Sequence, residues 1–178
     1  MKSIWKTILR ISVASILSML VYLICSFPLV AVLNDSNNSG AVKLICAILA
    51  NVAASLFMIW MLYIRTGEES KVIREDYQEQ EYRFWDDIKK CLAREQKNLL
   101  CILGILTVAF LAFMLDDFLL HKEIFSVVAV LYWPLYPFFM VLSETHAWLS
   151  PLIGMLQTPI TYLLILLLFR QKWYQKWK

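Results

Sequence analysis

Two short polar segments in the second half of the chain hold both of its histidines together with several carboxylates. Imidazole and carboxylate groups are ligands for zinc and similar divalent cations, and three or four of them that converge would form a site. The two histidines do not form an H-x-x-x-H pair, so we favour the interpretation that these are solvated loop residues. A divalent-metal site is the alternative, and its candidate ligands are Asp116, Asp117, His121, Glu123, Glu144 and His146.

The elements that position these residues are five stretches without Asp, Glu, Lys or Arg. The chain is 60% hydrophobic and 17% charged, whereas a soluble domain is roughly 45–50% apolar. The stretches are 17 to 23 residues long, and a helix that crosses a bilayer needs about 20 apolar residues. The sequence therefore predicts an all-α polytopic transmembrane helical bundle, a single membrane domain over residues 1–178 with four or five spans. The predicted spans are residues 11–33, 44–64, 99–115, 124–143 and 151–169.

Basic residues give the orientation. Lys and Arg gather before the first span and in the long connection of residues 66–98. Because such residues accumulate on the cytoplasmic side, we expect a cytoplasmic N-terminus and an outer loop at residues 34–40. This predicts a multi-pass protein of the cell membrane, either plasma or inner.

The stretch of residues 124–143 leaves the side of the C-terminus open. Pro134 and Pro137 interrupt it, and each removes a backbone donor from a helix. If the stretch is a kinked span, 11 Lys and Arg lie inside and 6 outside. If it is re-entrant, 15 lie inside and 2 outside. Both topologies remain open at this point.

The long connection ends in an amphipathic pattern over residues 82–98. Apolar side chains at helical spacing, surrounded by basic ones, are typical of an interfacial helix that lies on the cytoplasmic membrane surface. Docking of a soluble partner is the alternative use of this face. Aromatic residues near both chain ends also favour the headgroup region. The predicted interface residues are Trp5, Phe84, Trp85, Ile88, Leu92, Trp173 and Trp177.

Small and polar residues recur at helical spacing inside the first two spans. Such residues let membrane helices approach closely and hydrogen-bond to each other. We predict that the two faces meet, and a polar pore lined by Asn51 is the alternative. The first face contains Ser12, Ser15 and Ser18, and the second contains Ala47, Asn51 and Ser55.

The function expected from these patterns is not catalytic. The charge-free stretches hold no ionisable relay, and the motifs H-E-x-x-H, G-x-S-x-G and G-x-x-x-x-G-K are absent from the sequence. We expect no cofactor, no nucleic acid partner, and a bundle in the lipid bilayer that binds or supports another membrane protein or itself. One alternative is a small transporter or channel for a hydrophobic or weakly polar solute. The other is a metal-dependent membrane protein, including an enzyme, that uses the His and carboxylate cluster.

Overall fold

The computed structural model of this chain describes residues 2–26, 40–78, 81–115 and 149–178. Within these ranges every element is helical and there is no strand, which confirms the all-α prediction for this part of the chain. The predicted span of residues 124–143 lies outside the described residues. The elements are α1 (Lys2–Ser26), α3 (Gly40–Ile59), the π-helical turn η2 (Trp60–Ile64), α4 (Glu69–Tyr77), α5 (Phe84–Leu115) and α8 (Leu149–Trp177).

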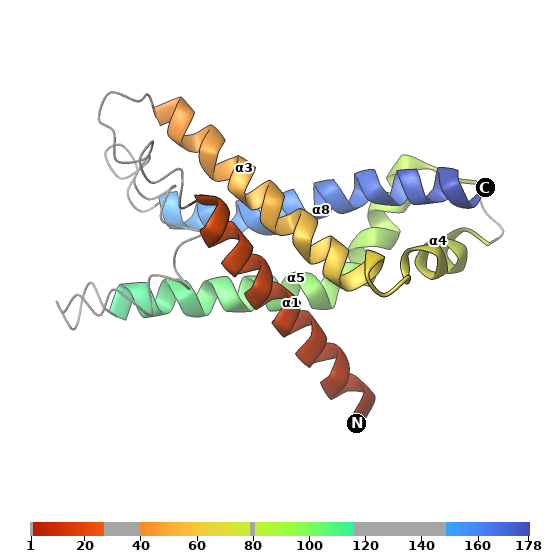
Figure 1. Ribbon diagram of the computed structural model, residues 1–178, viewed down its shortest axis with the longest axis horizontal. Helices are drawn as coiled ribbons and strands as arrows, with labels where there is room; N and C mark the ends of the chain where they lie inside the picture. The colour runs from red at the N-terminus through yellow and green to blue at the C-terminus, as the bar shows by residue number, and fades with distance from the viewer. Residues whose placement is uncertain (1, 27–39, 79–80, 116–148) are drawn as a thin grey trace.

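Helix α8 is the centre of the arrangement. Helices α3, α4 and α5 all pack against it, and α1 packs mainly against α3 and also against α5. Figure 1 shows α4 and the first turns of α5 beside the C-terminal part of α8. Segments from the middle and the end of the chain therefore meet in one region.

A tight turn joins η2 to α4. The N–H groups of Arg65 and Glu68 donate to the carbonyl oxygens of Trp60 and Tyr63, at 2.8 and 3.0 Å, which is the i to i+5 pattern of a π-helix. Gly67 follows with a φ of 65°, a left-handed conformation that costs a glycine little because it has no Cβ. The turn places α4 directly after the end of the second predicted span.

One described helical stretch, Leu44–Ile64, is long and apolar enough to cross a membrane. Ile8–Tyr22 is apolar as well but shorter. The predicted spans of residues 99–115 and 151–169 fall within α5 and α8. The number of spans stays a prediction.

Apolar side chains face outward on the four long helices. On α8 they follow each other every four residues, and on α1 every three or four, so each set forms a stripe on one helix face. Several of the polar side chains on these same helices are buried between the helices instead. The outward set includes Leu9, Val13, Ile16, Leu20, Ile24, Ile45, Leu49, Leu56, Leu100, Val108, Leu111, Leu156, Ile160, Leu164 and Leu168.

Helix α5 joins the predicted interfacial helix and the third predicted span in one element of 32 residues. Asp86 and Asp87 lie in its first turn, where carboxylates favour the positive end of the helix dipole. In Figure 1 the first turns of α5 run at an angle to the rest of the helix. Asp87 and Glu95 are buried on the side of α5 that faces the other helices, while Trp85 is 75% exposed.

Candidate functional site: buried polar clusters along helix α8

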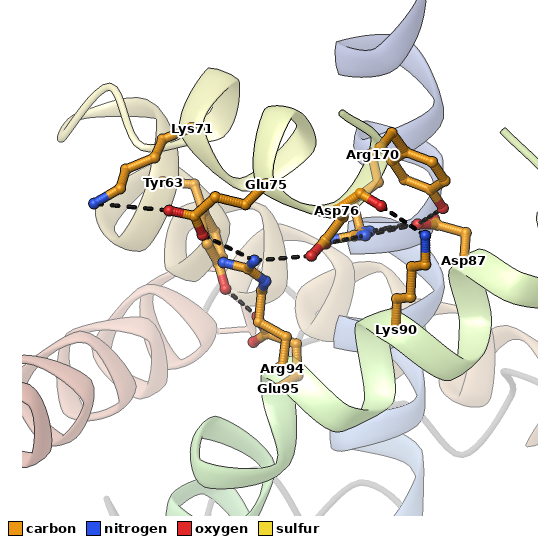
Figure 2. A network of polar contacts seen from close by, with 10 residues as sticks. Tyr63, Lys71, Glu75, Asp76, Asp87, Lys90, Arg94, Glu95 and Arg170 are labelled. Carbon is orange, nitrogen blue, oxygen red and sulfur yellow. Dashed lines mark hydrogen bonds and ion pairs between the residues drawn. The ribbon is translucent and has the colours of Figure 1, made fainter. Parts of the chain in front are cut away.

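The centre of the first cluster is Arg170, which is 1% exposed and lies between two aspartates. Its Nε donates to both carboxylate oxygens of Asp87, at 3.0 and 3.2 Å, and its Nη2 donates to Asp87 Oδ1 at 2.6 Å. Nη2 also donates to Asp76 Oδ2 at 2.7 Å. Figure 2 shows Arg170 of α8 reaching Asp76 of α4 and Asp87 of α5. We call Asp76, Tyr77, Tyr82, Asp87 and Arg170 the arginine cluster.

Neighbouring donors complete the coordination of the two carboxylates. Tyr77 donates its hydroxyl to Asp87 Oδ1 at 2.5 Å, and Tyr82 donates to Oδ2 at 3.4 Å. Arg94 Nη2 donates to Asp76 Oδ1 at 2.9 Å. Each buried carboxylate is thus paired with a guanidinium group, which is the condition under which charged groups tolerate burial.

The electrostatics of the cluster favour its present charge state. Burial opposes the charged form of Arg170, but its hydrogen bonds to Asp87 and Asp76 outweigh burial and raise its pKa. Burial, followed by the hydrogen bond to Asp87, raises the pKa of Tyr77 well above its ordinary value. Burial and the charge of Asp87 raise the pKa of Tyr82 to about 12. All three pKa values move away from neutrality, which suits a structural ion pair better than an acid or base catalyst.

A second cluster surrounds Glu95, which is 1% exposed. Tyr162 donates to its Oε2 at 2.7 Å, Asn98 donates Nδ2 to the same oxygen at 2.5 Å, and Tyr63 donates a short hydrogen bond to Oε1. The described donors to the Glu95 carboxylate are therefore two phenol hydroxyls and one amide, all of them uncharged. We call these four residues the glutamate cluster, and it ties η2, α5 and α8 together.

A third cluster of amide and hydroxyl groups joins α3 to α8. Asn51 donates Nδ2 to Gln157 Oε1 at 2.7 Å and accepts a hydrogen bond from Thr158 Oγ1 at 3.1 Å. Gln157 donates in turn to Thr161 Oγ1 at 3.0 Å. Thr158, Tyr162 and Arg170 are spaced in multiples of four, so the three clusters follow one stripe that turns gradually around α8.

A small cavity of about 30 Å³ lies beside the third cluster, between α1, α3, α5 and α8. Ser15 lines it and is 3% exposed, and its Oγ has no hydrogen-bond partner in the described structure. About 10–15 Å³ is enough to hold one water molecule. The cavity therefore has room for water that would satisfy Ser15, and it is far below the roughly 300–1,000 Å³ of a small-molecule site.

The predicted packing residues lie partly where the sequence places them. Ser15 and Ser18 of α1 and Asn51 and Ser55 of α3 are all buried and line the same cavity. Ser12 is half-buried, and the side chain of Ala47 lies outside the described residues. Asn51 bonds to α8, a partner that the sequence pattern did not indicate.

The predicted interface residues divide into two groups. Trp5, Phe84, Trp85, Leu92 and Trp177 are exposed.

Ile88 and Trp173 face inward instead. Ile88 is half-buried against the hydrophobic core. Trp173 is 9% exposed and packs on Tyr63, with ring centroids 5.8 Å apart. Trp173 is therefore covered by protein, because α8 continues past its apolar stretch alongside α4 and α5, and its assignment to the headgroup region stays a prediction.

The six candidate metal ligands lie outside the described residues, in the segment of residues 116–148. Within the parts of the chain that the structure describes, no group of three or more His, Cys, Asp or Glu residues is arranged to hold a metal ion. The metal site therefore stays a prediction.

Sequence reasoning missed Asp87, Glu95 and Arg170. Glu95 and Arg170 lie just outside the charge-free stretches and Asp87 lies in the polar connection, where charged residues are expected to be solvated. One signal was available, since Asp87, Cys91 and Glu95 follow each other every four residues and share a helix face. That face lies opposite the exposed Trp85 and is the one that α5 buries.

Comparison of the chain with protein-family models, with curated proteins and with solved structures finds no match.

Proposed function

We propose that this chain is an integral membrane protein of four spans that binds or supports another membrane component without catalysing a reaction. The spans are residues 11–33, 44–64, 99–115 and 151–169, to which α1, α3 with η2, the second part of α5, and α8 contribute. The membrane is the cell membrane, plasma or inner, with both termini on the cytoplasmic side. The partner is a second membrane protein or a second copy of the chain.

The observation that carries this proposal is the apolar outer surface of the described helices, which encloses an interior of apolar side chains with several polar ones among them. Apolar stripes face outward on α1, α3, α5 and α8, whereas Glu95, Asn51 and Ser55 are buried between the helices. A soluble bundle buries its apolar face and solvates its polar one. Lipid tails favour the arrangement found here, in which polar groups bond across helices.

The interior supports binding over transport. Arg170, Glu95 and Asn51 each bond to neighbouring helices, so these polar groups hold the bundle together. The cavity beside them, of about 30 Å³, has room for water and not for a solute. The outer apolar surface is then the part of the spans that is available to a partner.

The ion pairs of two arginines support a shared side for the termini. Arg10, near the N-terminal end of α1, donates Nη1 to Glu68 Oε1 at 3.0 Å. Arg170, near the C-terminal end of α8, bonds to Asp76 and Asp87. Glu68, Asp76 and Asp87 all belong to the connection of residues 66–98. In a membrane, contacts of this length require both chain ends to be on the side of that connection, which corresponds to 15 Lys and Arg inside and 2 outside.

Photo-crosslinking tests this function. A photoreactive amino acid placed at an outward position, such as Leu164 of α8 or Ile16 of α1, should yield a protein adduct from at least one helix face in native membranes. The inward position Leu166, which is 1% exposed, is the matched control and should yield only adducts within the chain.

Two outcomes separate this proposal from transport. An adduct with a second copy or another membrane protein, at one helix face only, supports binding. Lipid adducts alone at every outward position, together with a purified monomer that moves a solute across liposome membranes, would overturn it.

A further inference from the structure

A second hollow, of about 200 Å³, opens between α1, η2, α4 and α5. Three cationic side chains line it, Arg10, Arg94 and Lys97, and one carboxylate, that of Glu68. The remaining wall includes apolar side chains, among them Ile11, Leu62 and Val72. The hollow is thus amphipathic, with more positive than negative charge.

The charged side chains of this hollow differ in how completely other side chains of the protein pair with them. Arg10 and Glu68 neutralise each other through contacts of 3.0 and 3.2 Å. Arg94 donates to Glu75 and Asp76 from Nη2 alone, at 3.1 and 2.9 Å, so its Nε and Nη1 have no bond within the described structure. Lys97 is exposed and forms no ion pair with any described residue. Two donor groups of Arg94 and the charge of Lys97 therefore remain for an anion.

The position of the hollow along the chain indicates its depth in a membrane. Arg10 directly precedes the first charge-free stretch, and Lys97 and Asn98 directly precede the third. Leu62 and Tyr63 come at the end of the second. In the proposed topology all these positions reach the same cytoplasmic boundary, which is the depth of the lipid headgroups.

The N-terminal end of α4 borders the hollow. Glu68 and Val72 line the hollow, and Val72 N donates to the carbonyl of Glu68 at 2.9 Å. The N-terminus of this nine-residue helix is therefore adjacent to the hollow. The positive end of a helix dipole favours negative charge nearby, and Glu68 and Glu69 of the chain itself already supply it here.

We propose that this hollow binds the phosphate of an anionic phospholipid of the cytoplasmic leaflet. The proposal rests on the membrane topology proposed above. Basic pockets between membrane helices on the cytoplasmic side are suited to anionic headgroups, and guanidinium groups bind phosphate oxygens through several donors. A free phosphate ion shares this chemistry, but the apolar wall of Ile11, Leu62 and Val72 favours a ligand with an apolar part.

The test is thermal unfolding of the full chain in mild detergent, with three probes titrated separately: short-chain phosphatidylglycerol, short-chain phosphatidylcholine and inorganic phosphate. We expect saturable stabilisation by phosphatidylglycerol and little by the other two. Lys97→Gln should weaken the apparent affinity for phosphatidylglycerol roughly fivefold, the effect of about 1 kcal/mol for one basic residue near an anionic lipid. The control Lys89→Gln removes an exposed lysine of the same helix that does not line the hollow. Its apparent affinity for phosphatidylglycerol should stay within about twofold of the wild type, because surface substitutions away from a site have small effects.

The outcomes are separable. Equal stabilisation by phosphatidylcholine, or equal loss in Lys97→Gln and Lys89→Gln, overturns the lipid site. Inorganic phosphate that competes over the same concentration range overturns the lipid and assigns the hollow to a soluble anion. Alkaline extraction tests the topology itself: a chain that stays in the membrane keeps the proposed function even if the site fails, whereas a chain released from it removes both proposals.

Discussion

Arg170 and Asp87 lie 83 positions apart in the sequence and form three hydrogen bonds in the interior of the protein. The aspartate is 0% exposed and the arginine 1%. This pair joins the last turns of α8 to the first turn of α5, and Asp76 adds α4 to the same contact. The three helices that meet at this end of the bundle are therefore fixed to each other by one guanidinium group.

Arg170→Gln should destabilise the protein strongly. Removing one partner of a buried ion pair leaves the other charge uncompensated, which costs about 3–5 kcal/mol. The measurement is the free energy of unfolding in mixed micelles of mild and denaturing detergent. Lys172→Gln, an exposed change two residues away, is the control and should leave that free energy unchanged.

A double-mutant cycle gives the outcome that would contradict this role. Asp87→Asn in the Arg170→Gln background should cost less than Asp87→Asn alone, because the carboxylate has already lost its main partner. Additive effects of the two substitutions would show that the pair does not stabilise the fold.

The helices themselves were accessible to sequence reasoning, because long charge-free stretches have few alternatives to a helix. The pairing of Arg170 with Asp87 was not, since the two residues come together only when α5 and α8 pack. Trp173 illustrates the same limit: its aromatic and basic neighbours are typical of a membrane interface, but packing against Tyr63 buries it.

The search that predicted the spans did not find the polar clusters. The third charge-free stretch begins at Leu99, one residue after Asn98 and four after Glu95. The last one ends at Phe169, directly before Arg170. Burial of those residues depends on tyrosines and aspartates from other helices, which the local sequence cannot indicate. The six candidate metal ligands lie outside the described residues, so that prediction is unchanged.

Both termini should label from the cytoplasmic side. In a variant that lacks the four native cysteines, Lys178→Cys should react with a membrane-impermeant maleimide only after the cells are opened. Asn37→Cys and His146→Cys should react in intact cells, because α1 and α8 then have their other ends outside. Labelling of Lys178→Cys in intact cells would contradict this prediction. It would mean that the chain has five spans and that Arg170 lies on the opposite side of the membrane from Asp76 and Asp87.

Asn51→Leu should destabilise the bundle without changing the flux of solutes through liposome membranes that contain the protein. The variant loses the bonds to Gln157 and Thr158, and a hydrogen bond between membrane helices contributes roughly 0.6–2 kcal/mol. Asn51→Leu and Thr158→Val should therefore be non-additive in the unfolding free energy. Asn51→Leu and Thr107→Val should be additive, because Thr107 is exposed and bonds to its own helix. A changed solute flux in liposomes that contain Asn51→Leu would instead favour the channel.

Cys91 should be almost inert to alkylation in the folded protein. It is 1% exposed, and burial raises its pKa to about 12. Since only the thiolate reacts, the rate at pH 8 should be on the order of a thousandfold below that of an exposed cysteine, and it should rise about tenfold per pH unit with no plateau near pH 9. The measurement is the alkylation rate in a variant whose other three cysteines are replaced. The reference protein carries Cys91→Ser and Ala93→Cys in addition, which moves the thiol to an exposed position two residues along α5. Similar rates for the two proteins would mean that the alkylating reagent reaches the face of α5 that carries Asp87 and Glu95. The packing of α5 against α8 would then be too weak to keep the arginine cluster buried.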